Sequence, residues 1–179
     1  MPSILPLTSD SIEKAAAALR AGELVAFPTE TVYGLGADAT NDTAVAKIYE
    51  AKNRPSFNPL IVHFPDIDSV REVADLSPMA ERIAARFWPG AISFVLPRKA
   101  DCPLSRLVSA GLPTFAARVP AQEGARKLLR AAGIPVAGPS ANSSGRISPT
   151  QASHVADDLG DRVSLILDDG PCAVGVEST

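Results

Sequence analysis

The chain has 179 residues, of which 46% are hydrophobic and 5% aromatic, and its formal net charge at pH 7 is −3. This length suits one domain with a substantial core, and the acidic balance argues against a protein that mainly grips a long nucleic-acid backbone. No apolar run is long enough to cross a bilayer and residues 1–9 contain no secretory signal, so we expect a cytoplasmic protein without a membrane partner.

A capped amphipathic helix is expected first. Thr8, Ser9 and Asp10 offer caps, and apolar residues then recur at helical spacing until Gly22. Apolar periodicity and boundary Pro or Gly residues predict, in chain order, a strand at Leu24–Phe27, a helix from Asp42 that ends before Pro55, a strand at Leu60–Phe64, helices near Ile67–Ala74 and Pro78–Phe87, strands at Ile92–Leu96 and Thr114–Val119, a helix at Ala121–Ala132, a strand at Ile134–Ala137, a helix near Thr150–Leu159 and a strand at Val163–Leu167. Because helices and strands interleave, the predicted class is α/β.

Several common sites can be excluded. The sequence contains no P-loop, and Gly34-Leu35-Gly36 lacks the rest of a dinucleotide fingerprint. Cys102 and Cys172 form no metal or redox spacing, and with two histidines in the chain a structural zinc site is not expected. Any phosphate chemistry would therefore depend on fixed cationic side chains.

Polar clusters lie at element ends in the first half of the chain. Residues 28–36 follow a buried strand, and their threonine and tyrosine hydroxyls suit a small polar ligand, although a capped turn has the same composition. Lys52 and Arg54 end a helix before Pro55 and match phosphate oxygens, although cations also favour a helix C-terminus. His63 ends an apolar strand, where a structural histidine is the alternative.

Two more clusters follow in the second half. Thr114, Ala116 and Arg118 share one strand face, and the arginine needs an anionic partner there, either a protein carboxylate or a ligand carboxylate. Residues 138–150 follow a strand and lead into a helix. Their hydroxyls, amide and backbone donors suit an anion, and a solvent loop is the alternative.

A family resemblance connects these clusters. The matching segments, which span nearly the whole chain in order, are Pro28–Gly36, Lys52-x-Arg54-Pro55, Asn58–His63, Phe87–Gly90, Thr114-x-Ala116-x-Arg118-Val119-Pro120, Ser140-Ala141-Asn142-x-Ser144-Gly145-x-x-Ser148-Pro149-Thr150 and Gly175–Thr179. Together they resemble the YrdC-like threonylcarbamoyl-adenylate synthases, and the paired K-x-R and S-x-N signatures make the resemblance specific.

The resemblance implies a fold and a reaction. It implies one YrdC-like α/β domain over residues 1–179, with a twisted, open mixed sheet flanked by helices. The implied enzyme is a nucleotidyltransferase that converts L-threonine, bicarbonate and ATP into threonylcarbamoyl-adenylate and pyrophosphate. A tRNA threonylcarbamoyl transferase would then use the product to modify an adenosine beside the anticodon. Mg²⁺ is expected with ATP, and no tightly bound organic cofactor is expected.

The resemblance also implies roles for residues at matched positions. Lys52 and Arg54 are the expected catalytic residues, since they would stabilise phosphate and carbamate oxygens. The expected threonine-binding residues are Thr31, His63, Arg118, Ser140 and Ser178. The expected ATP-binding residues are Arg54, Asn58, Thr114, Asn142 and Thr150. No metal ligand is identified.

The sequence departs from its relatives after Gly175–Thr179. Relatives continue into another strand, and longer members into a linker and a C-terminal domain, so we expect a domain that lacks both. The alternative function is a non-catalytic module that binds RNA or a nucleotide. Few aromatics and an acidic charge weigh against a dedicated RNA reader, while weak RNA binding stays open. A hydrogenase-maturation domain is a further alternative, but the acylphosphatase-like and zinc-finger segments of those enzymes are not in the sequence.

Overall fold

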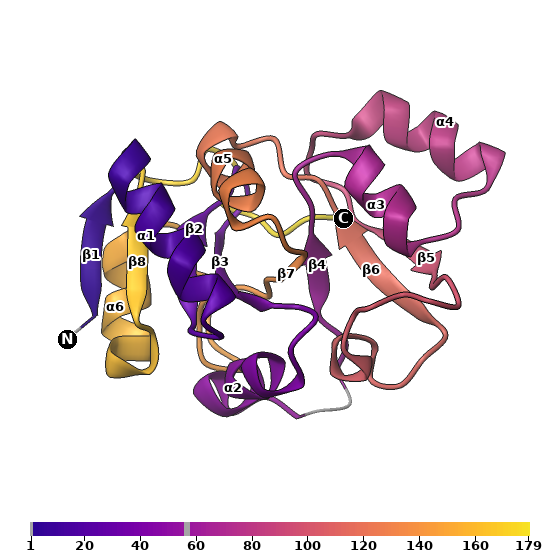
Figure 1. The fold of residues 1–179 in the computed structure, drawn as a ribbon. Helices are drawn as coiled ribbons and strands as arrows, with labels where there is room; N and C mark the ends of the chain where they lie inside the picture. The colour runs from indigo at the N-terminus through magenta and orange to yellow at the C-terminus, as the bar shows by residue number, and fades with distance from the viewer. Residues whose placement is uncertain (1, 56–57) are drawn as a thin grey trace.

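The computed structural model describes residues 2–55 and 58–179, and its helices and strands interleave along the chain (Figure 1). The strands are β1 (Ser3–Pro6), β2 (Val25–Pro28), β3 (Tyr33–Asp38), β4 (Ile61–His63), β5 (Phe94–Pro97), β6 (Thr114–Arg118), β7 (Val136–Ala137) and β8 (Leu165–Asp168). The helices are α1 (Ser9–Arg20), α2 (Asp42–Lys52), α3 (Ile67–Val73), α4 (Pro78–Phe87), α5 (Glu123–Ala132) and α6 (Ala152–Leu159), with short 3₁₀ helices η1 (Arg106–Ser109) and η2 (Gly160–Arg162).

The strands form one mixed sheet in the order β1-β8-β2-β3-β7-β4-β6-β5. β8 pairs in parallel with both β1 and β2, and β4 pairs in parallel with β6. The pairs β2–β3, β3–β7, β4–β7 and β5–β6 are antiparallel. The predicted α/β class and mixed sheet are therefore confirmed.

Two apolar clusters pack against this sheet. Alternate residues of β2 belong to different clusters, with Val25 and Phe27 in one and Ala26 in the other, as the period of two in a strand requires. The Phe27 cluster is covered by α1 and α5, whereas α2, α3, α4 and α6 contribute to the other cluster. Both faces of the sheet are thus buried, which explains why its central strands are predominantly apolar.

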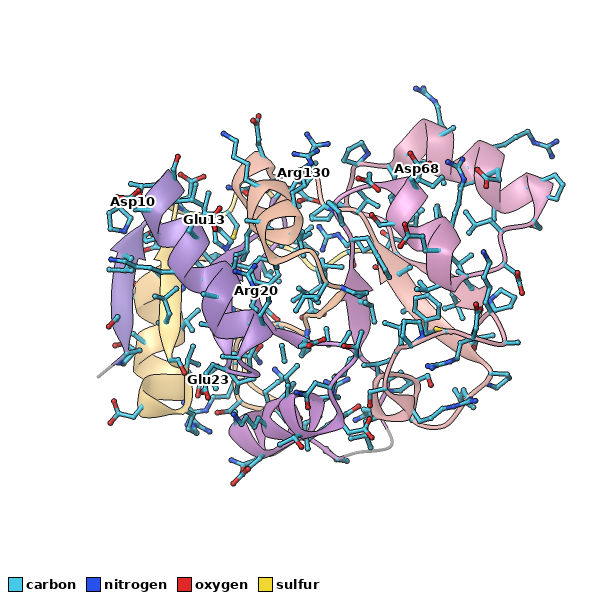
Figure 2. All side chains as sticks on the ribbon, viewed as in Figure 1. Asp10, Glu13, Arg20, Glu23, Asp68 and Arg130 are labelled. Atoms are coloured by element: carbon cyan, nitrogen blue, oxygen red, sulfur yellow. The ribbon has the colours of Figure 1, made fainter. Side chains whose placement is uncertain are left out.

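α1 shows how local sequence fixes an element. The Thr8 hydroxyl accepts from the Ser11 amide at 3.2 Å and the Ser11 hydroxyl accepts from the Thr8 amide at 2.8 Å, which satisfies two otherwise unpaired amides. At the other end, Arg20 donates to the carbonyl oxygen of Ala131 at 2.7 Å and so ties α1 to the neighbouring α5 (Figure 2).

Two strands were not expected from the sequence. β1 is an exposed edge strand of four residues that ends in proline, so it carries little strand signal. β3 contains Gly34 and Gly36, which favour a turn when only the sequence is considered. The structure gives the reason for both glycines, because a Cβ at either position would meet the Phe27 ring at 3.3 and 3.0 Å, respectively.

The C-terminal segment returns across the sheet. After β8 it runs from the β1 side of the molecule to an end near β4 and β6 (Figure 1). The Thr179 amide donates to Ala91 and the Ser93 amide donates to Thr179, at 3.1 and 2.8 Å. No helix within the described ranges is both long and apolar enough to span a bilayer.

Candidate active site

A pocket of about 160 Å³ lies over the sheet face that carries Ile61 and His63. Its lining comes from six separate parts of the chain, namely Thr31 and Val32, Arg54, Pro59 with Ile61 and His63, Arg118, residues 138–140, and Glu177 with Ser178. We call this the Arg118 pocket. Since β4 and β6 are parallel and His63 is paired with Arg118, the two side chains enter it from neighbouring strands.

Arg118 is held by three protein acceptors. Its side chain is 4% exposed, and it forms an ion pair with Glu30. It also donates to the Thr31 hydroxyl at 3.0 Å and to the Gly90 carbonyl at 3.2 Å. A guanidinium group has five N–H donors, so two remain for a ligand. The partner left open by the sequence is therefore a protein carboxylate.

Glu30 was not predicted as a site residue, although it lies within residues 28–36. Its second carboxylate oxygen accepts from the amides of Ala121 and Gln122 at 3.0 and 3.2 Å, beside the start of α5. Glu30 and Arg118 are 88 residues apart, and a lone glutamate in a polar segment carries no signal of such a distant partner.

His63 is a neutral imidazole at physiological pH. Burial, together with the nearby Arg118 charge, lowers its pKa from 6.5 to about 3. Its ring meets Phe27 edge-on, with centroids 5.9 Å apart. Within the described chain Nδ1 has no hydrogen-bond partner, and a Cβ on Gly138 would lie 2.9 Å from it. His63 therefore presents an uncharged polar group to the pocket.

Arg54 enters the pocket because of how α2 ends. The helix stops at Lys52, Asn53 adopts a left-handed conformation at φ 50°, and the Arg54 amide donates back to Tyr49 at 2.9 Å. The guanidinium then donates to the Pro59 carbonyl at 3.2 Å, while the buried Nε has no partner among the described residues. The expected helix end before Pro55 is confirmed.

Lys52 takes a different direction. Its side chain points away from solvent, and its ammonium group donates to the main-chain oxygens of Ser140 and Asn142. Lys52 is not one of the described residues that line the Arg118 pocket, although Arg54, two residues later, is. The two members of the K-x-R signature are thus separated by the structure.

The C-terminal segment forms one wall of the pocket. The amides of Val174 and Gly175 donate to the carbonyls of Glu30 and Thr31 at 2.9 and 3.0 Å. Farther along, the Ser178 hydroxyl lies 2.9 Å from that of Ser93. Glu177 accepts from the Ser148 hydroxyl at 2.5 Å, so this wall also contacts the loop after β7.

A second pocket, of about 550 Å³, adjoins that loop. It is lined by Asn142, residues 145–149, His154, Asp157 and Asp158, and we call it the Asn142 pocket. The Asn142 amide donates to Ser143 and Arg146 at 2.9 and 2.8 Å. Its carbonyl Oδ1 is buried and has no partner within the described residues, so it remains an acceptor for a ligand donor.

The structure brings the expected threonine residues together more fully than the expected ATP residues. All five of the former line the Arg118 pocket. Of the latter, Arg54 lines the Arg118 pocket and Asn142 the Asn142 pocket, whereas Asn58, Thr114 and Thr150 line neither. Thr114 lies on the same face of β6 as Arg118 and, from strand geometry, about 13 Å away.

The donor set does not form a metal cage. Across residues 2–55 and 58–179 there is no group of three or more His, Cys, Asp or Glu side chains that could hold an ion. Glu177 is the one carboxylate that lines the Arg118 pocket in the described chain, and it already accepts a hydrogen bond from Ser148. The described residues therefore contain no ready-made cage of three or more such side chains for a metal ion.

Comparison with known proteins adds independent findings. The family model Sua5_yciO_yrdC, described as telomere recombination, matches residues 17–179. A threonylcarbamoyl-AMP synthase of Bacillus subtilis is 54% identical over 176 residues, which cover 98% of this chain and 51% of the relative. A threonylcarbamoyl-AMP synthase of Pyrococcus abyssi is 48% identical over 169 residues, which cover 94% and 49%.

A solved structure agrees with these relatives. The crystal structure of P. abyssi Sua5 complexed with L-threonine matches with a TM-score of 0.94 and 45% identity, over 100% of this chain and 53% of that one. The chain thus spans about half the length of the relatives it matches.

Proposed function

Because this chain belongs to the Sua5/YciO/YrdC family, we propose that it forms threonylcarbamoyl-adenylate and pyrophosphate from L-threonine, bicarbonate and ATP. The observation that carries the proposal is the convergence of Thr31, His63, Arg118 and Ser140 with Arg54 around one small pocket. Its volume lies well below that of pockets for drug-sized ligands, which suits a single amino acid.

The Arg118 pocket supplies the chemistry that threonine needs. The two N–H donors of Arg118 not used by the protein match a carboxylate, and charge-assisted hydrogen bonds of this kind are among the strongest in proteins. The hydroxyls of Thr31, Ser140 and Ser178 offer both donors and acceptors for the remaining polar groups. His63 adds a neutral group, so it does not repel the threonine ammonium before that amine loses its proton.

The reaction proceeds in two balanced steps. The threonine ammonium first loses a proton, and the amine nitrogen then bonds to the carbon of bicarbonate with loss of water, which yields a carbamate. A carbamate oxygen then attacks the α-phosphorus of ATP while the bond from that phosphorus to the bridging oxygen breaks, and pyrophosphate leaves. Such a displacement depends mainly on positioning and charge stabilisation.

Arg54 is the proposed source of that charge. It lines the Arg118 pocket beside Pro59, and its buried Nε is free of partners in the described chain. ATP would extend from Arg54 along Asn58 and Thr114 and toward Asn142 and Thr150. Since Mg²⁺ at nucleotide sites is held largely by substrate phosphates, the ion would enter with ATP. The product would pass to a tRNA threonylcarbamoyl transferase.

Pyrophosphate release by the purified chain tests this function. We expect release only when L-threonine, bicarbonate and ATP are all present, with each omitted in turn as the control. Release that persists without threonine or without bicarbonate would indicate a different reaction. Absence of release while threonine and ATP both bind would contradict turnover by this chain.

A further inference from the structure

Lys52 makes its polar contacts with a loop rather than with the pocket. Its side chain, 1% exposed, ends in an ammonium group that donates to the Ser140 carbonyl at 2.5 Å and also to the Asn142 carbonyl. Its own main-chain oxygen accepts from the Ser144 amide at 2.7 Å. One residue at the end of α2 therefore holds three points within residues 140–144.

The two carbonyls belong to residues whose side chains face different pockets. Ser140 lines the Arg118 pocket, and Asn142 lines the Asn142 pocket. The ammonium group thus contacts the main chain of the loop, while the two side chains are free to face the pockets. A shift of either carbonyl would move a side chain that is proposed to contact substrate.

The charge on Lys52 is matched by these carbonyls and not by a carboxylate. No ion pair of Lys52 is found within the part of the chain that the structure describes. Hydrogen bonds from a charged donor are stronger than those between neutral groups. Together with the Ser144 contact, these two bonds tie the loop to the end of α2.

We infer that Lys52 is a positioning residue, which fixes residues 140–144 so that Ser140 and Asn142 face their ligands, and that it does not contact the reacting phosphate. This inference rests on the proposed function for the identity of the ligands. It separates the roles of Lys52 and Arg54, which the sequence resemblance gave as two catalytic residues.

Equilibrium binding to the Lys52→Met variant tests the inference. Methionine keeps the length of the side chain but removes the donors, so we expect affinities for L-threonine and for a non-hydrolysable ATP analogue to fall about tenfold each. The control is Lys47→Met, because Lys47 lies in the same helix and donates to the distant Gly22 carbonyl at 2.8 Å. Its affinities should stay within twofold of the wild type.

Amide hydrogen exchange of the same two variants gives a readout that does not depend on substrate. Exchange in residues 140–146 should accelerate in Lys52→Met and not in Lys47→Met, while α1 stays unchanged in both. Unchanged loop exchange and normal affinities, combined with loss of pyrophosphate release, would overturn the inference, since they are expected of a residue that touches the transition state. Both readouts remain valid if the wild-type chain releases no pyrophosphate.

The pH dependence of binding offers a further test. Burial lowers the pKa of Lys52 from 10.5 to about 8, and the nearby Arg54 charge adds to this effect. The charges of Glu177 and Asp158 oppose it. Affinity for the ATP analogue should therefore decline as pH rises through about 8, because the ammonium loses its charge. The same decline in Lys52→Met would count against the inference.

Discussion

The Arg118 pocket and the Asn142 pocket differ in how fully the side chain that gives each pocket its name is paired within the protein. Arg118 has three acceptors, and Thr31 accepts one of its N–H groups. In the Asn142 pocket, by contrast, the buried Oδ1 has no partner among described residues, and Ile147 beside it is 94% exposed. The Arg118 pocket also contains unpaired buried atoms, His63 Nδ1 and Arg54 Nε, so the contrast concerns Arg118 itself.

This difference indicates that the two pockets bind different ligands. A site whose charges are fixed before binding loses little free energy to ordering, so the Arg118 pocket is pre-organised for a small ligand. The Asn142 pocket keeps an acceptor and an apolar side chain available, so it becomes fully satisfied only with a ligand in place. Arg54 lies in the first pocket but is proposed to act on the ligand of the second.

The largest effect is expected for Arg54→Ala. Loss of a group that stabilises charge in the transition state typically lowers turnover by about 100- to 1000-fold. We expect that loss in pyrophosphate release, with the free energy of unfolding nearly unchanged. Arg86→Ala, at an exposed arginine of α4, is the control. Near-normal turnover of Arg54→Ala would remove the proposed link between the pockets.

Glu30→Gln should have the next largest effect, on stability. It leaves the Arg118 charge buried without a compensating carboxylate, and removal of one partner of a buried pair costs several kcal/mol. Because the Glu30 side chain is 14% exposed, the cost should lie below that of a fully buried pair. We expect the free energy of unfolding, measured with urea, to decrease by about 2 kcal/mol. Glu23→Gln breaks an exposed pair with Lys47 and should cost less than about 0.5 kcal/mol. Equal losses of unfolding free energy in the two variants would show that the Glu30–Arg118 pair stabilises the protein no more than an exposed pair does.

Asn142→Ala should act on one pocket only. Removal of the Oδ1 acceptor and of the amide contacts should weaken ATP about tenfold, as expected for roughly one hydrogen bond, and threonine less than twofold. Calorimetric titration of each ligand measures the difference. Ser143→Ala, which removes a hydroxyl bonded to Asp158 at 2.8 Å, controls for general loosening of the loop. Equal losses of affinity for ATP and threonine would contradict the assignment of the two ligands to separate pockets.

The smallest effect is expected for a decrease in pH of about half a unit below 6.5, the start of a decline that grows as the pH falls further. In the folded protein His63 stays neutral down to about pH 3, whereas the unfolded chain takes up a proton near 6.5. The unfolded state therefore binds more protons between these values, and the free energy of unfolding should decline as pH falls from 6.5 toward 3. NMR of the imidazole, with His154→Gln to leave one histidine, should show no titration of His63 near 6.5.

Local signals in the sequence predict most elements of this fold. Caps and helical spacing define α1, and the proline after Arg54 sets the end of α2. These local signals do not predict structure that depends on a residue distant in the sequence. The glycines of β3 look like a turn because the Phe27 ring that excludes a side chain there belongs to another strand.

The site follows the same rule. The family resemblance supplied all five residues that were expected to bind threonine, and they share one pocket. It did not supply Glu30 as the partner of Arg118, because the pairing depends on the fold. It gave Lys52 and Arg54 one role from a shared motif, and the contacts of Lys52 with the loop after β7 become visible only in the fold.

The position of β8 has a consequence for synthesis of the chain. It lies between β1 and β2, so Ser3 and Val25 both pair with Leu165. β1 and β2 are made before β8 and thus keep an unpaired edge until residues 165–168 emerge, and such edges favour aggregation. Long-range pairing of this kind also slows folding. Protection of the nascent protein would matter most in the interval before β8 is inserted.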